Sequence, residues 1–344
     1  MAQANKQANN SSGGGVSLPV PTRQTRGSRS LMLLILDGVL PAALVIALVT
    51  FGLLLPGLFF TPENLLGILR YAALGGIVVA GFSLALIAGQ IDFSTVQVGI
   101  LTSAVFAALY QYQSWPLLPA LLVALLAAAA CGLLSALIIN VLKVPSLVTT
   151  LAVGVLALGL SYVIFDFYGA TGSLRLSRPP VRSIATATPL GVPIAVWTML
   201  LVYGLSYGVL NYTRFGAHLY AVGGNAQAAR VNGVRVEWVI TAVMVTVALL
   251  AGLATLLFSG RNITVSPSAA VISAPLAAVL LAGVSLAGGS GRLERTLLAV
   301  LFFAVLGIGL SLLALPAFVR VILEGSVFVL ALLGESARQH LETR

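Results

Sequence analysis

A short polar stretch between two apolar runs holds the side chains best suited to contact a polar ligand. Gln90, Asp92 and Ser94 follow one long apolar run, and Gln97 comes about one helical turn later. Polar and ionisable groups between such runs often line a water-filled path for a solute. A carboxylate in this place can also accept backbone N–H groups at the start of the next helix. Both interpretations of Asp92 stay open at the level of sequence.

Two further hydroxyl groups, those of Thr149 and Thr150, stand near the start of another apolar run. They could hydrogen-bond the hydroxyl groups of a solute. Threonines inside helices more often bond carbonyl groups of their own preceding turn. We therefore take both threonines as candidates for the substrate path, together with the four residues above, and keep the structural role as the alternative.

The longest polar connection in the second half of the chain, Asn211–Glu237, predicts a short helix between two turns. Two glycines allow a turn, Asn225 is a favourable N-cap, residues 226–231 favour helix and Gly233 can end it. Small side chains permit close approach to a groove, and two polar residues three apart share one face. The residues concerned are Gly223, Gly224, Asn225, Ala226, Gln227, Ala228, Ala229, Arg230 and Gly233.

The sequence patterns offer little support for covalent catalysis or for a metal site. Cys131 is the single cysteine, so neither a disulfide framework nor a cysteine-rich metal site can form within one chain. The motifs G-x-x-x-x-G-K-[ST] and H-E-x-x-H do not occur. The two histidines, His218 and His340, both fall in predicted polar segments. We therefore expect a non-catalytic protein without a cofactor or metal, which takes any energy it needs from a partner.

The composition indicates what kind of structure positions these residues. Of 344 residues 59% are hydrophobic and only 8% are charged, which cannot cover a water-facing surface. Apolar runs of ~20 residues, enough to cross a hydrocarbon core as helix, recur along most of the chain. Spanning segments must satisfy their own backbone hydrogen bonds, and barrel strands would alternate instead. The prediction is an all-α polytopic protein in a lipid bilayer.

Ten spans are predicted between two terminal tails. The tails are residues 1–30, polar and expected to be disordered, and residues 336–344, and the spans lie within a transmembrane domain of residues 31–335. The spans are Leu31–Leu55, Asn64–Ile87, Phe93–Tyr110, Leu117–Leu142, Leu147–Phe167, Leu190–Leu210, Trp238–Ser259, Ala269–Ala287, Leu293–Leu315 and Phe318–Leu333.

The distribution of basic residues predicts the orientation. With both termini in the cytoplasm, twelve of the 18 lysines and arginines lie inside, as the positive-inside rule requires. The connection Phe167–Pro189 is then external and Asn211–Glu237 internal. Because the basic residues are scattered over short connections and a tail, the net charge of +9 does not indicate nucleic-acid binding.

Four motifs, in order along the chain, resemble those of permease subunits in bacterial ABC importers for monosaccharides of the ribose, arabinose and xylose type. Together they cover roughly residues 62–333. Residues 213–234 resemble the family's T-R-F-G-x-x-x-Y-A-x-G-G-N-x-x-A-A-R-x-x-G-V. The others are G-Q-I-D-F-S at 89–94, V-P-S-L-V-T-T-L at 144–151 and G-V-S-L-A-G-G-S-G at 283–291.

The resemblance implies about ten helices per subunit, in the inner membrane, with two subunits lining one path. It further implies a cytoplasmic ATPase that docks on a coupling helix, here 223–233, and an external solute-binding protein. The chain departs from the family pattern at Ala226 and Gln227, where acidic residues are common, and at Gln90, which replaces a glycine. Permeases for branched-chain amino acids or nucleosides share part of these patterns and are the alternative. A secondary transporter would normally show paired carboxylates near mid-span, and the later spans have few acids.

Overall fold

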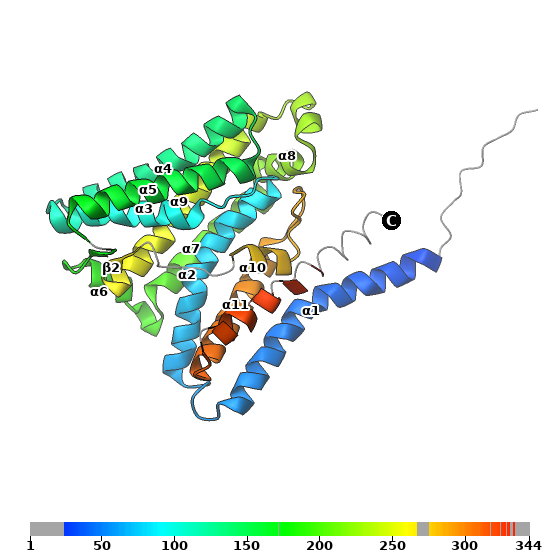
Figure 1. Cartoon of the computed structure of the whole chain (residues 1–344). Coiled ribbons are helices and arrows are strands. Elements are labelled where there is room, and N and C mark those ends of the chain that lie inside the picture. The colour runs from blue at the N-terminus through cyan, green and yellow to red at the C-terminus, as the bar shows by residue number, and fades with distance from the viewer. Residues whose placement is uncertain are drawn as a thin grey trace, which may run out of the picture. The chain divides into compact units, whose positions relative to one another are not determined.

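The computed structural model describes residues 24–170, 172–266, 275–316, 318–323, 325–327, 329–330 and 333, shown in Figure 1. The chain divides by its contacts into two units, residues 1–38 and 39–344. Of the first unit, the described part begins at Gln24 with the start of α1. The second unit holds the remaining elements and the residues of the candidate site.

Helices account for most of the described chain. Their bounds are α1 Gln24–Leu54, α2 Pro62–Ile87, α3 Thr95–Ala107, the π turn η1 Ala108–Tyr112, α4 Leu117–Leu142, α5 Ser146–Phe167, α6 Val181–Thr186, the short 3-10 turn η2 Pro189–Gly191, α7 Ile194–Tyr212, α8 Arg214–Val231, α9 Val236–Asn262, α10 Pro275–Leu281 and α11 Leu293–Leu312. The two short strands are β1 Leu174–Arg175 and β2 Thr264–Val265.

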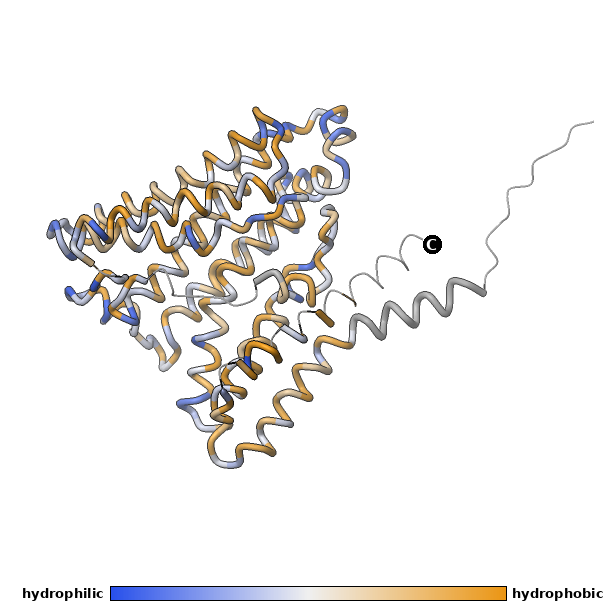
Figure 2. The backbone as a smooth tube through the Cα atoms, in the orientation of Figure 1, coloured by the Kyte–Doolittle hydropathy of each residue, from blue (hydrophilic) through white to orange (hydrophobic). Residues whose placement is uncertain are grey.

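Six of the described helices are long and apolar enough to cross a membrane: α2, α4, α5, α7, α9 and α11. Residues 38–54 of α1 add a shorter apolar stretch. Figure 2 shows hydrophobic residues along most of the helices and hydrophilic residues gathered near helix ends and around α8. The protein is therefore polytopic and mainly α-helical, as the composition predicts.

Some predicted spans differ from the observed helices. The span expected at Phe93–Tyr110 begins as α3 at Thr95, has 13 α-helical residues and continues into η1. In the span expected at Ala269–Ala287, residues 267–274 lie outside the described residues, and among the described ones α10 covers the seven residues Pro275–Leu281. It ends before Gly283, one of several glycines at positive φ in this segment. The span expected at Phe318–Leu333 is described only in part, so the count of ten stays a prediction.

The terminal tails fall mainly outside the described residues, which include neither 1–23 nor 334–344. Residues 24–30, assigned to the tail from sequence, belong to α1. The connection Phe167–Pro189 carries α6 and the strand β1, which pairs antiparallel with β2 through Leu174↔Val265 and Arg175↔Thr264. This small ladder is the departure from an all-α fold in the described chain.

The helix α9 is the centre of the second unit and packs against α2, α3 and α4. Small residues let the helix axes approach, as is common between helices in lipid. At Gly132 of α4, a Cβ would lie 2.7 Å from the carbonyl oxygen of Met244 on α9. At Gly252 of α9, a Cβ would lie 3.0 Å from the Thr102 side chain on α3. This packing holds α3 and α4 against α9, the helix that follows α8.

Candidate functional site

The polar stretch between α2 and α3 is a non-helical break that α5 holds by hydrogen bonds. The hydroxyl oxygens of Ser146 and Thr150 accept the backbone N–H groups of Ile91 and Phe93, each at 3.1 Å. Ser146 and Thr150 are four residues apart and so share one face of α5. Because buried backbone donors need partners, this pair of hydroxyls allows the chain to leave the helical path here. Thr150 therefore has a structural role, with its side chain fully buried.

Asp92 shapes the turn that precedes α3. Its Oδ1 accepts the backbone N–H of Ser94 at 2.7 Å and the Ser94 hydroxyl at 2.6 Å, and the residue is only 2% exposed. Ser94 itself occupies the N-cap position of α3 and makes no side-chain capping bond. The expectation that the carboxylate accepts a backbone N–H at this helix start is confirmed, although the bond lies just ahead of the helix.

Two candidate residues of the path carry buried polar atoms that find no partner in the described structure, Gln97 Oε1 and Thr149 Oγ1. Gln97 lies against Gly154 of α5, where a Cβ would be 3.5 Å from the Gln97 oxygen and 3.3 Å from the Ser94 Cα. A buried polar group without a hydrogen bond costs about 1–3 kcal/mol and therefore needs an explanation, such as a water or a ligand. Gln90 differs, because its amide is 3.5 Å from the Ala88 carbonyl.

The adjacent threonines give a matched test of structural and ligand-binding roles. Thr150→Val should lower the free energy of unfolding by about 1–3 kcal/mol, because the Phe93 N–H loses its acceptor. Thr149→Val removes a hydroxyl that has no protein partner, so stability should stay unchanged or rise while uptake of the solute falls. The measurements are thermal unfolding of the purified protein and uptake in vesicles. Normal uptake by a stable Thr149→Val variant would remove Thr149 from the path.

Three glycine-containing segments, far apart in sequence, meet beside this break. The N–H of Gly289 donates to the carbonyl of Ile87, the last residue of α2, at 2.9 Å. Gly288 has φ +86, and a Cβ on it would lie 2.7 Å from both the Gly89 Cα and the Gly223 oxygen. A Cβ on Gly223 would overlap the Ile87 oxygen. Glycine is required because backbone contacts backbone at this point, which we call the glycine junction: Gly89, Gly223, Gly288 and Gly289.

The glycine junction joins three of the four sequence motifs, those at residues 89–94, 213–234 and 283–291. Gly288 and Gly289 were not among the predicted site residues. Their signal was a Gly-Gly pair in a connection between apolar runs, which indicates a turn or a close backbone contact. Tyr220 adds a bond to the same segment by donating its hydroxyl to the Gly291 carbonyl at 2.9 Å. Burial raises the pKa of Tyr220, so the hydroxyl keeps the proton that it donates.

The helix α8 breaks in the middle, at Asn225. This residue has φ −159 and ψ 98, and its side-chain oxygen accepts the N–H of Ala228 at 2.9 Å, which confirms the predicted N-cap. The end at Gly233 is also confirmed, with φ +84 and an N–H bonded to the Arg230 carbonyl. The turn predicted at Gly223 and Gly224 lies one residue later, because the helix from Arg214 continues through both glycines and breaks at Asn225. We call the part after the break, residues 226–231, the short helix.

The short helix exposes most of the residues assigned to partner binding, with one exception. Ala226, Gln227, Ala228 and Arg230 are exposed, whereas Ala229 is 5% exposed and belongs to the hydrophobic core. A contact of Ala229 with a partner protein is therefore excluded in this conformation. Helical geometry explains the difference, because neighbouring residues point about 100° apart around the axis.

Arg230 has an ion-pair partner within the chain. Its guanidinium bonds the Glu237 carboxylate at the start of α9, and the Lys143 ammonium lies 3.9 Å from the same oxygen. The Asn140 amide donates to the Glu237 carbonyl at 2.9 Å. Lys143 ends α4 and stands three residues before Ser146, so the short helix is connected to the segment that holds the polar break. Glu237 and Lys143 were absent from the sequence-based site.

The arrangement links an exposed helix to buried polar groups. Within the described residues, no three side chains of the histidine, cysteine or acidic type gather as metal ligands. The short helix connects with the polar break by two routes, the glycine junction and the Arg230–Glu237–Lys143 cluster. These contacts lie between the exposed short helix and the buried polar groups at α2, α3 and α5.

Comparisons with known proteins give a consistent result. Residues 64–332 match the family model described as branched-chain amino acid transport system / permease component. The chain is 32% identical over 284 residues to the ribose import permease protein of Escherichia coli K12, in an alignment that covers 82% of this chain and 88% of the relative. It is 29% identical over 296 residues to the corresponding protein of Haemophilus influenzae, with coverage of 86% and 91%. The xylose transport system permease protein of E. coli K12 is 28% identical over 385 aligned positions, with coverage of 94% and 97%.

Proposed function

Because the chain belongs to the family of permease components of branched-chain amino acid transport systems, we propose that it is the membrane-spanning permease subunit of an ATP-driven importer and passes a monosaccharide. The observation that carries this proposal is the similarity to ribose and xylose permeases over more than four fifths of the chain. The alignments cover 88% and 97% of these two relatives, which supports a subunit of the same type. The chain itself performs no covalent step in this function.

The importer has three kinds of partner. A cytoplasmic ABC ATPase binds the short helix, an extracytoplasmic solute-binding protein delivers the sugar, and a second permease subunit completes the path. The location is the bacterial inner membrane, with ten spans and both termini in the cytoplasm. The basic residues support this orientation, since it places Arg214, Arg230 and Arg235 around α8 on the cytoplasmic side.

Transport requires two states whose balance depends on nucleotide. A ligand shifts a conformational equilibrium only by binding the two states differently, so ATPase movement must reach the solute site through structure. The short helix receives that movement, and the polar break responds because α5 and the glycine junction hold it. Gln97 and Thr149 are the residues we propose to meet the sugar hydroxyls, since each carries a buried polar atom without a protein partner among the described residues.

Uptake measurements test the substrate. Cells that produce the complete importer should accumulate labelled ribose or xylose, and cells with this gene deleted should not. An excess of unlabelled leucine or adenosine should leave sugar uptake unchanged. The family description favours branched-chain amino acids as the second candidate. If deletion of the gene abolishes leucine uptake and leaves sugar uptake unchanged, the transported solute is an amino acid and not a sugar.

A charge exchange tests whether Arg230 acts within the chain or on the ATPase. Arg230→Glu places two carboxylates together and should weaken ATPase retention in pull-down, most strongly at low salt. If the pair with Glu237 matters, the double variant Arg230→Glu, Glu237→Arg should recover retention. Both side chains are about half exposed, so the effect on folding stability should be below about 1 kcal/mol. If the double variant does not recover ATPase retention, Arg230 contacts the ATPase directly.

A further inference from the structure

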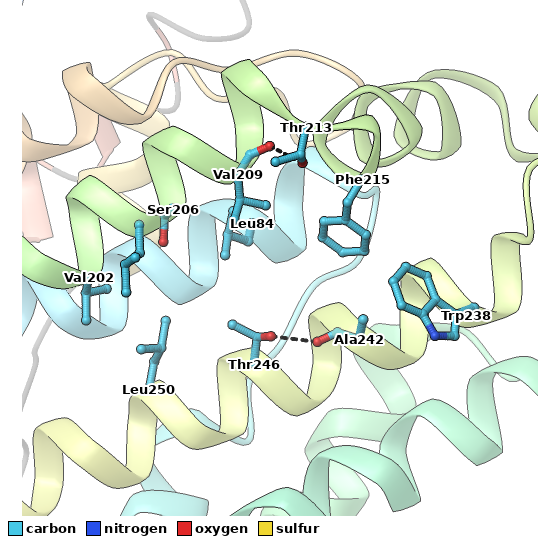
Figure 3. Close-up of a pocket in the computed structure, with 11 residues that line it drawn as sticks. Leu84, Val202, Ser206, Val209, Thr213, Phe215, Trp238, Ala242, Thr246 and Leu250 are labelled. Atoms are coloured by element: carbon cyan, nitrogen blue, oxygen red, sulfur yellow. Dashed lines mark hydrogen bonds between the residues drawn. The ribbon is translucent and has the colours of Figure 1, made fainter.

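An apolar groove of about 540 Å³ opens between α7 and α9, over α2. It includes none of the residues assigned above to the path, the glycine junction or the short helix. Figure 3 shows Val202 and Val209 of α7 on one side and Leu250 of α9 on the other. The lining hydroxyls of Thr213 and Thr246 donate to carbonyls of their own helices, at 2.6 and 2.7 Å. The walls therefore suit a hydrocarbon and offer a sugar few polar partners.

The length of the groove corresponds to one leaflet of a bilayer. Along α9 the lining extends from Trp238 to Leu250, which is about 18 Å at the rise of an α-helix. Half of a ~30 Å hydrocarbon core is about 15 Å. A helix about 10 Å across and 18 Å long would need roughly 1,400 Å³, far more than the groove provides. An extended acyl chain matches both length and volume better than a protein helix does.

One end of the groove has the residues of a membrane interface. The rings of Phe215 and Trp238 meet edge to face, with centroids 5.3 Å apart (Figure 3). Trp238 is 59% exposed, and tryptophan favours the level of the lipid headgroups. Arg214 stands between the lining residues Thr213 and Phe215, and Arg235 precedes Trp238 by three residues. Both arginines are exposed, and in the described chain neither guanidinium has a hydrogen-bond or ion-pair partner.

We propose that the groove binds one acyl chain of an anionic phospholipid whose phosphate is held by Arg214 and Arg235. The charge of the two guanidiniums selects an anionic headgroup, and the apolar walls select the chain. This inference uses the membrane location of the family and is independent of the transported solute. Each basic residue near a membrane surface increases the affinity for an anionic lipid about fivefold, so two residues should increase it roughly thirtyfold.

Fluorescence quenching tests the proposal without substrate or ATPase. The variant Trp115→Phe, Trp197→Phe retains Trp238 as its single tryptophan. It is reconstituted in phosphatidylcholine vesicles that contain an increasing fraction of a lipid brominated on its acyl chains. The brominated lipid is phosphatidylglycerol in one series and phosphatidylcholine in the other. We expect brominated phosphatidylglycerol to reach half-maximal quenching of Trp238 at a mole fraction several-fold to thirtyfold lower than brominated phosphatidylcholine does.

Substitutions identify the parts of the site. Arg214→Gln with Arg235→Gln should abolish the preference for phosphatidylglycerol, and Arg175→Gln with Arg182→Gln, at the other end of the bundle, should preserve it. Val209→Phe partly fills the groove and should weaken quenching by either lipid, whereas Val155→Phe on the exposed face of α5 should not. Equal quenching of Trp238 by the two lipids, or a preference that survives loss of both arginines, would overturn the proposal. Either result leaves sugar uptake as a separate question.

Discussion

Replacing Gly223 by alanine should abolish solute uptake and destabilise the protein, whereas the same change at Gly224 should be tolerated. A Cβ on Gly223 would overlap the Ile87 oxygen and lie 2.5 Å from the Gly289 nitrogen, both of them backbone atoms. Backbone cannot move away as a flexible side chain can, so α8 must shift from the end of α2. Overpacking of this kind typically costs about 1–3 kcal/mol.

Gly224 provides the matched control because it is exposed and its nearest atom to an added Cβ is the Gly289 Cα at 4.0 Å. Alanine there should change stability by no more than about 1 kcal/mol, and in the stabilising direction, since alanine favours helix over glycine. Uptake and thermal unfolding are measured on both variants. If Gly223→Ala is as stable and active as Gly224→Ala, the glycine junction does not transmit movement to the polar break.

A tryptophan at position 228 should abolish sugar-stimulated ATP hydrolysis and uptake while leaving the fold intact. Ala228 is exposed on the short helix, so the bulky ring projects outward and prevents close approach of the ATPase. Membrane insertion and the unfolding temperature should stay near normal, because the side chain at position 228 is exposed. The measurements are ATPase co-purification, hydrolysis in proteoliposomes and thermal unfolding.

The adjacent alanine separates docking from packing. Ala229 is 5% exposed, so Ala229→Trp should lower stability by several kcal/mol or prevent folding. Ala130→Trp, on the exposed face of α4, controls for bulk in the membrane and should be neutral. Normal ATPase retention and uptake in Ala228→Trp would show that the short helix does not contact the ATPase.

Local signals of the sequence were reliable for this chain. Long apolar runs predicted α2, α4, α5, α7, α9 and α11, because a segment that must satisfy its own hydrogen bonds in lipid becomes a helix. The N-cap at Asn225 and the end at Gly233 were also predictable. Each depends on residues within one turn, so tertiary contacts had little influence on them. The family, too, could be inferred from motifs along the chain and is confirmed by the match over residues 64–332.

Packing shifts other features away from what local preference predicts. Gly223 and Gly224 suggest a turn, yet the helix continues through them and breaks only at Asn225, because glycine there permits contact with Ile87 and Gly289. In the part of the span Ala269–Ala287 that the structure describes, α10 ends at Leu281, and the segment after it turns to reach the break after α2. A preference of about 1 kcal/mol per glycine is small beside the contacts of a buried backbone junction.

The amino-acid sequence is enough to predict the long helices, the membrane location that their apolar runs require and the identities of the polar residues. Which of those residues face each other depends on the tertiary structure. Gly89, Gly223 and Gly288 meet although more than sixty residues separate each from the next, and Thr149 and Thr150 differ in whether their hydroxyls have a partner. Local sequence sets backbone conformation within a turn or two, whereas these contacts depend on how α2, α5 and α8 pack together. The candidate site is therefore a product of packing, and the elements that carry it are a product of the sequence.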